Sequence, residues 1–168
     1  MRTFALLVLA IVFAAPLYAA DIVAEPFPPA KFTAFYIEYS KSNGSTSVQL
    51  SGDTLVYKVT NHDNKVIDQA TIQPTGEDWF NFIQALNNAK VYKWAHTYQY
   101  PGQGPSWVID LTMDDRKFYS EGTDEFPKNG DESQPQADPT AGPSIPFLQF
   151  WQAVLVLCGK AKVSELVK

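Results

Sequence analysis

Four short stretches of alternating apolar and polar residues constrain the fold of this chain more than any other feature of its sequence. Alternation with a period of two places successive side chains on opposite faces of a β-strand. Turn-forming residues separate the stretches, among them Asn43-Gly44, a pair favoured in tight hairpins. The pattern predicts an antiparallel meander of four strands. The predicted strands are Phe32–Tyr39, Ser45–Leu50, Thr54–Thr60 and Val66–Ile72.

Two other segments repeat apolar residues with helical spacing. Thr75 is suited to cap the first, because Glu77 and Asp78 follow in its first turn and apolar residues recur at positions 79, 82, 83 and 86. Ser144 is placed to begin the second helix, and Gly159 is placed to end it. Three further strands are predicted between the helices: Val91–Tyr100, Trp107–Met113 and Arg116–Glu121.

The order of these elements defines the expected fold class. Runs of strands interrupted by helices indicate an α+β domain, with an antiparallel sheet of about seven strands and both helices packed on one face. The length of the chain suits one such domain, over residues 21–168. The first helix contains Phe82-Ile83-Gln84-Ala85-Leu86 and the second contains the similar Phe150-Trp151-Gln152-Ala153-Val154. An internal duplication is therefore an open alternative.

The first twenty residues predict export. Arg2 precedes an apolar run from Phe4 to Ala15, and Pro16 and small residues follow before Asp21. This pattern is typical of a secretory signal peptide over residues 1–20. The run is shorter than the ~20 apolar residues of a membrane span. We expect a periplasmic or secreted protein of a Gram-negative bacterium, without a stable membrane anchor after signal cleavage.

Composition narrows the partners that we expect. A formal net charge of -5 argues against nucleic acid, whose phosphates require a basic surface. Cys158 is the only cysteine and lies on an apolar helical stripe, so it is expected to be a buried hydrophobe. The only histidines, His62 and His96, lie on different predicted elements without further ligands at zinc spacing. We expect no metal and no cofactor.

The sequence offers no catalytic motif. No serine stands in a nucleophile-elbow pattern. The acidic pairs Asp114-Asp115 and Asp124-Glu125 are typical of solvent-facing turns, whereas acid–base catalysis requires two carboxylates held in different environments. We therefore do not expect an enzyme.

Aromatic residues form the first candidate site. Tyr92, Trp94, His96, Tyr98 and Tyr100 alternate along the predicted fifth strand, so they are expected to share one face of the sheet. We interpret this face mainly as core. The rings beside the loop that follows are the candidates for partner contact: Tyr98, Tyr100 and Trp107.

Acidic residues form the second candidate site. Residues 110–138 contain nine acids and three bases, and residues 122–143 form a polar, Pro-rich stretch. We expect that stretch to be a solvated loop. Its acids are candidates to attract a basic protein, because complementary charge speeds encounter. The candidates are Asp124, Glu125, Asp131 and Glu132.

A pattern of Trp, Tyr, Gly and Trp runs from residue 94 to residue 151. It comprises Trp94, Tyr98 or Tyr100, Gly104, Trp107, Gly122 and Pro127, with the helix predicted after Ser144. The pattern resembles an uncharacterised small secreted bacterial domain of unknown function. The chain departs from it in having Gly104-Pro105-Ser106 where an Asp-Gly turn is usual, and in the long insertion after Pro127. The resemblance supports the α+β fold and implies no activity or site residue.

These observations favour an exported, non-enzymatic protein that binds another macromolecule, such as an inhibitor or immunity-type protein with a basic envelope or secreted partner. Two alternatives stay open. One is a small-ligand or glycan-binding module that uses exposed aromatic rings. The other is a hydrolase that uses paired acids.

Overall fold

The computed structural model describes residues 31–127 and 142–161, and the predicted signal peptide lies outside them. The order of elements agrees with the sequence except between the first helix and the sixth strand. The strands are β1 (Phe32–Lys41), β2 (Gly44–Ser51), β3 (Thr54–Asn61), β4 (Val66–Ile72), β5 (Thr97–Gln99), β6 (Ser106–Met113) and β7 (Arg116–Thr123). The helices are α1 (Gly76–Asn88), a short 3-10 turn η1 (Val91–Lys93) and α2 (Ile145–Leu157).

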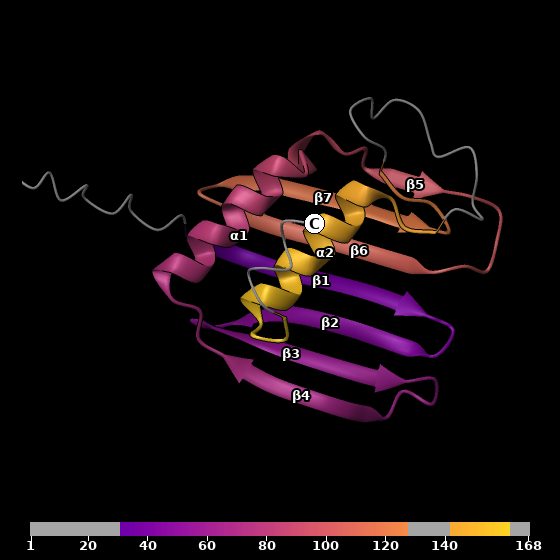
Figure 1. Ribbon diagram of the computed structural model, residues 1–168, viewed down its shortest axis with the longest axis horizontal. Coiled ribbons are helices and arrows are strands. Elements are labelled where there is room, and N and C mark those ends of the chain that lie inside the picture. The colour runs from indigo at the N-terminus through magenta and orange to yellow at the C-terminus, as the bar shows by residue number, and fades with distance from the viewer. Residues whose placement is uncertain (1–30, 128–141, 162–168) are drawn as a thin grey trace, which may run out of the picture.

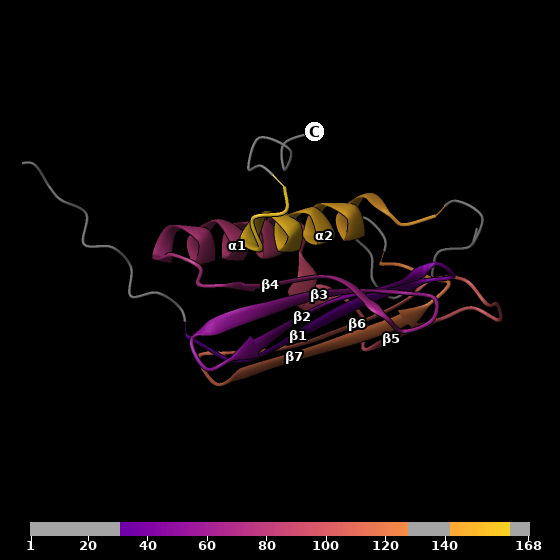
Figure 2. The same cartoon turned by 90° about the horizontal axis from the view of Figure 1, so that it is seen from below.

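The seven strands form one sheet in the order β4-β3-β2-β1-β6-β7-β5. Helices α1 and α2 pack side by side on one face of this sheet, and no helix of the described residues covers the other face (Figures 1 and 2). The expected α+β fold is confirmed. Neither of the two described α-helices is long and apolar enough to cross a membrane.

The expectation of a wholly antiparallel sheet is wrong at one edge. β5 pairs with β7 in parallel, while every other neighbouring pair is antiparallel. β5 and β6 run in opposite directions, as the strands of a hairpin do, but β7 lies between them. Since β7 is antiparallel to β6, it must run parallel to β5.

The prediction of a strand over Val91–Tyr100 is also wrong. The chain forms η1 and then only the three-residue β5. Val91 and Trp94 are both buried, and a 3-10 turn brings side chains three residues apart to the same side. The expected aromatic stripe is therefore split: Tyr98 is buried with Trp94, while Tyr92 and Tyr100 are 45% and 39% exposed.

Local signals placed both helices correctly. The Thr75 side chain accepts a hydrogen bond from the backbone N–H of Asp78, whose carboxylate accepts one from the Thr75 N–H, so the two form a capping box. Ser144 caps α2 in the same position. Cys158 follows α2 as a buried residue, and burial raises the pKa of its thiol to about 12, which makes the thiolate scarce.

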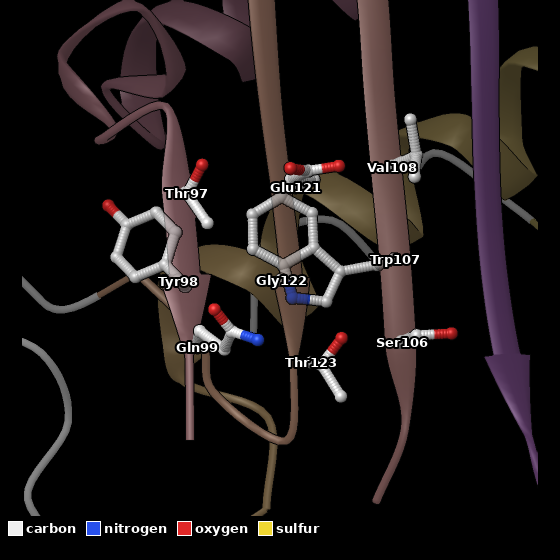
Figure 3. Close-up of a pocket in the computed structure, with 9 residues that line it drawn as sticks. All are labelled: Thr97, Tyr98, Gln99, Ser106, Trp107, Val108, Glu121, Gly122 and Thr123. Carbon is white, nitrogen blue, oxygen red and sulfur yellow. The ribbon is translucent and has the colours of Figure 1, made fainter. Parts of the chain in front are cut away.

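Trp107, near the start of β6, contacts the segment that follows β7. Its indole Nε1 donates a hydrogen bond to the backbone carbonyl of Glu125 over 2.9 Å. The ring lies across Gly122 of β7, where an added Cβ would come within 2.5 Å of the indole (Figure 3). Phe126, the next residue, lies in the core and packs against Phe147 of α2.

The start of the predicted solvated loop is consequently a packed segment. Gly122 and Thr123 belong to β7, and Glu125, Phe126 and Pro127 are buried. The expectation of a loop over residues 122–143 is therefore wrong for residues 122–127. Burial of Phe126 and the bond from Trp107 explain the difference, because both draw the backbone inward.

We predict that Gly122→Ala destabilises the fold by about 1–3 kcal/mol, because the new methyl group overpacks the indole of Trp107. Gly76→Ala is the matched control: its Cβ would meet nothing within 4 Å at the start of α1. The free energy of unfolding is measured in urea by tryptophan fluorescence. Equal stabilities of the two variants would contradict the role given to Gly122.

Candidate functional site on the open face of the sheet

The sheet face opposite α1 and α2, here named the open face, carries an organised group of polar side chains. In β1, Phe35, Ile37 and Tyr39 are buried toward the helices, while Tyr36 and Glu38 alternate with them. Successive side chains of a strand point to opposite faces, so Tyr36 and Glu38 lie on the open face.

Strand register assembles a group of five residues in the middle of this face. Tyr36 pairs with Asp110 of β6, which pairs with Tyr119 of β7. One row away, Val108 of β6 lies between Glu38 and Glu121. We name this group the tyrosine–carboxylate patch; its members are Tyr36, Glu38, Asp110, Tyr119 and Glu121.

Each tyrosine of the patch is tied to the glutamate two residues further along its strand. The Tyr36 hydroxyl donates a hydrogen bond to Glu38 Oε2, and Glu38 Oε1 accepts another from Ser40 Oγ over 3.0 Å. The Tyr119 hydroxyl donates to Glu121 Oε2 over 2.7 Å. Both rings are therefore held in place before any ligand arrives.

The environment keeps both phenols protonated. Burial raises the pKa of Tyr36 to about 12, and its hydrogen bond to Glu38 and the charge of that carboxylate act in the same direction. For Tyr119 the hydrogen bond to Glu121 is the main cause of a raised pKa, followed by burial and the charges of Glu121 and Asp110. At physiological pH both hydroxyls are donors bound to carboxylates.

Asp110 is the least satisfied member of the patch. Its Oδ1 atom is buried and makes no hydrogen bond with any of the residues that the structure describes. Lys117 Nζ lies 3.8 Å from Oδ1, close enough for an ion pair but too far for a hydrogen bond. A buried carboxylate oxygen without a hydrogen bond is costly, so this atom favours a better-placed cationic donor.

A pocket of about 200 Å³ lies beside the patch, where β5, β7 and β6 run next to one another (Figure 3). We name it the polar hollow. Its open-face side chains are Thr97, Gln99, Ser106, Val108, Glu121 and Thr123. The residues between them are buried toward the helices and line the hollow with backbone: Tyr98, Trp107 and Gly122.

A wider depression of about 700 Å³ lies at the sheet edge beyond Tyr119. Tyr92 and Phe118 meet there edge to face, and the ring of His96 lies 4.7 Å from that of Tyr119. His96 Nδ1 is 3.3 Å from the Tyr119 carbonyl oxygen. Glu121 lines both this depression and the polar hollow.

The structure does not gather the predicted contact residues on one surface. Tyr98, Trp107 and Glu125 are only 3%, 2% and 4% exposed, so as free partner contacts they are corrected to core positions. Tyr100 is accessible, and the half-buried Asp124 has its carboxylate against the backbone of the loop between β5 and β6. The other two candidates, Asp131 and Glu132, lie outside the described residues.

The two alternative functions, a glycan-binding module and a hydrolase, depended on side chains that the structure places in the core or in turns. Trp94, Tyr98 and Trp107 are buried, so an aromatic glycan-binding module cannot use these rings. Asp114 and Asp115 form the tight turn between β6 and β7, both with positive φ. Within residues 31–127 and 142–161, no group of three or more His, Cys, Asp or Glu side chains is placed to hold a metal ion.

Sequence reasoning missed the tyrosine–carboxylate patch, although a signal for it was present. The motif Tyr-x-Glu occurs twice, as Tyr36-Ile37-Glu38 and Tyr119-Ser120-Glu121. In a strand, a tyrosine and a glutamate two positions apart share a face. A repeat of this motif in two predicted strands therefore indicated two tyrosine–carboxylate pairs.

Comparison with known proteins adds no family to this description. No protein-family model matches the chain. No curated protein matches it either. The site is therefore interpreted from its own geometry.

We predict that Glu38→Gln lowers the pKa of Tyr36 from about 12 toward its ordinary value of 10.0 without reaching it, because burial, the larger cause, remains. The stability that folding gains from the raised pKa of Tyr36 is complete below pH 10 and is lost as the pH rises through 12. The free energy of unfolding of Glu38→Gln should therefore fall less than that of the wild type between pH 10 and 12. Tyrosine-ring NMR across a pH titration measures the pKa. Glu121→Gln is the control, which lowers the pKa of Tyr119 and leaves that of Tyr36; an unchanged Tyr36 in Glu38→Gln would contradict the assignment.

Proposed function

We propose that this is an exported, non-enzymatic bacterial protein that binds another protein, of the inhibitor or immunity type, through the open face of its sheet. The observation that carries the proposal is the row in which Asp110 lies between Tyr36 and Tyr119. The partner is a basic protein that presents an arginine to this row. Residues 1–20 support export by their signal-peptide pattern.

Charge favours a basic partner. The patch contributes three carboxylates, and Lys117 is paired with only one of them, at 3.8 Å. The whole chain carries a formal net charge of -5. An acidic surface attracts a basic protein during diffusion and disfavours acidic competitors.

The chemistry of the row favours arginine. A guanidinium group is planar, stacks on aromatic rings and donates two parallel hydrogen bonds to a carboxylate. Tyr36 and Tyr119 supply rings on either side of Asp110, whose Oδ1 has no hydrogen bond within residues 31–127 and 142–161. An arginine from the partner therefore replaces the Lys117 ammonium group, 3.8 Å from Oδ1, with two donors at hydrogen-bond distance.

The patch is also preorganised. Tyrosines provide a large contact area and lose little conformational freedom on binding, especially when their hydroxyls are already bonded. Strand register rather than a loop sets the positions of all five residues. A preformed surface of this kind suits tight protein inhibitors, whose backbones move little on binding.

The test is a ¹H–¹⁵N NMR titration with a tetra-arginine peptide, with tetra-glutamate as the reference. We expect saturable shifts in the open-face residues of β1, β6 and β7 for tetra-arginine alone. Asp110→Asn should weaken binding roughly tenfold, because hydrogen bonds to charged groups contribute about 1.5–3 kcal/mol. Asp53→Asn, in the exposed turn between β2 and β3, is the matched control and should bind as the wild type does.

Lys117→Met supplies an independent check. Because it removes the ammonium group that competes for Asp110, it should strengthen peptide binding severalfold. The proposal is overturned if Asp110→Asn and Asp53→Asn bind equally, or if the shifts lie away from the patch. Weaker binding by Lys117→Met would equally contradict a site for a cation.

A further inference from the structure

The polar hollow adjoins the proposed protein contact, shares only Glu121 with it, and has polar side chains that make no hydrogen bond with the described residues. Four of its side chains are polar and uncharged: Thr97, Gln99, Ser106 and Thr123. Within the part of the chain that the structure describes, none of these four side chains makes a hydrogen bond. Glu121 uses Oε2 for Tyr119, and Oε1 takes part in no hydrogen bond with the described residues.

Strand register explains why these groups converge. Thr97 pairs with Glu121, which pairs with Val108. Gln99 pairs with Thr123, which pairs with Ser106. Two rows of side chains therefore enclose the hollow, and the backbone around Gly122 separates them as its floor (Figure 3).

The floor is rigid because the helix side of the same strands is tightly packed. The indole of Trp107 fills the space that a side chain at position 122 would need. The rings of Tyr98 and Phe147 lie 5.7 and 5.3 Å from it. The hollow is thus a preformed site on regular strands rather than a gap between loops.

The size of the hollow restricts the ligand. Its volume of about 200 Å³ is enough for several water molecules or one small ring. The hollow therefore fits a single small polar molecule.

The composition of the rim restricts the ligand further. Three hydroxyls and an amide each donate and accept hydrogen bonds, and a carboxylate only accepts them. Val108 adds one apolar surface, and none of the described residues that line the hollow is a cation. Neutral sugars match this set, because each ring hydroxyl donates and accepts while the ring C–H groups contact apolar atoms. An anionic ligand is disfavoured by Glu121.

We propose that the polar hollow binds a neutral pyranose sugar ring. Thr97, Gln99, Ser106 and Thr123 bond its hydroxyls, and Glu121 accepts from one or two of them. The site shares Glu121 with the tyrosine–carboxylate patch but does not include Asp110, and it uses none of the buried rings of Trp94, Tyr98 and Trp107 for stacking.

The test is a ¹H–¹⁵N NMR titration with glucose, galactose and mannose, and with glucuronate as the anionic match for glucose. We expect saturable shifts confined to residues 97–99, 106–108 and 121–123, with millimolar affinity for at least one neutral sugar and weaker binding of glucuronate. Thr123→Val keeps the shape of the side chain and removes its hydroxyl. It should weaken sugar binding roughly threefold to tenfold, the effect of one lost neutral hydrogen bond.

Thr71→Val, at an exposed position on the far strand β4, is the matched control and should bind sugar as the wild type does. The proposal is overturned if no neutral sugar shifts the hollow, if glucuronate binds as tightly as glucose, or if Thr123→Val binds normally. Thr123→Val should still bind tetra-arginine, so failure of the sugar site and failure of the protein contact give different results. A disaccharide of the bound sugar then distinguishes two sources of the ligand. If the natural ligand is the end of a glycan chain, the disaccharide binds at least as tightly as the monosaccharide. If it is a free monosaccharide, the disaccharide binds more weakly.

Discussion

The contact between the Trp107 indole and Gly122 is the constraint on which the rest of this structure depends. The Trp107 indole also packs against Phe147 of α2, and its hydrogen bond to the Glu125 carbonyl holds the following segment at the core. Alternation then fixes the opposite face. Because Trp107 and Gly122 point toward the helices, their neighbours Ser106 and Thr123 must point away, toward the hollow.

The same alternation gives the open face its chemical character. Polar residues on an uncovered sheet face usually need only water as a partner. Here two tyrosines are hydrogen-bonded to glutamates on their own strands, and Asp110 lies between them with a buried oxygen that makes no hydrogen bond in the described part of the chain. This incomplete satisfaction supports the proposed protein contact, because a partner gains most where the free protein is least satisfied.

Local signals were sufficient for most of the fold. The meander, both capped helices and the burial of Cys158 follow from periodicity, turn residues and capping side chains that act within a few positions. β5 could not be predicted in this way. The burial of Val91 and Trp94 against the helices overrides an alternating pattern, and the same packing buries Tyr98. The internal duplication, the signal peptide and the contacts of Asp131 and Glu132 stay predictions.

The candidate site depends on pairings between distant parts of the chain, and this is why only its parts were visible in the sequence. Each Tyr-x-Glu motif is local, but β1 and β6 must pair before Asp110 reaches Tyr36. Glu121 then joins two surfaces, because it holds the Tyr119 hydroxyl and also lines the polar hollow. In the proposed sugar site, a ligand that bonds Glu121 Oε1 shares this carboxylate with the Tyr119 hydroxyl on Oε2. Occupancy of the hollow and the position of that ring are therefore linked, and by thermodynamic reciprocity whatever fixes the ring also changes the affinity of the hollow.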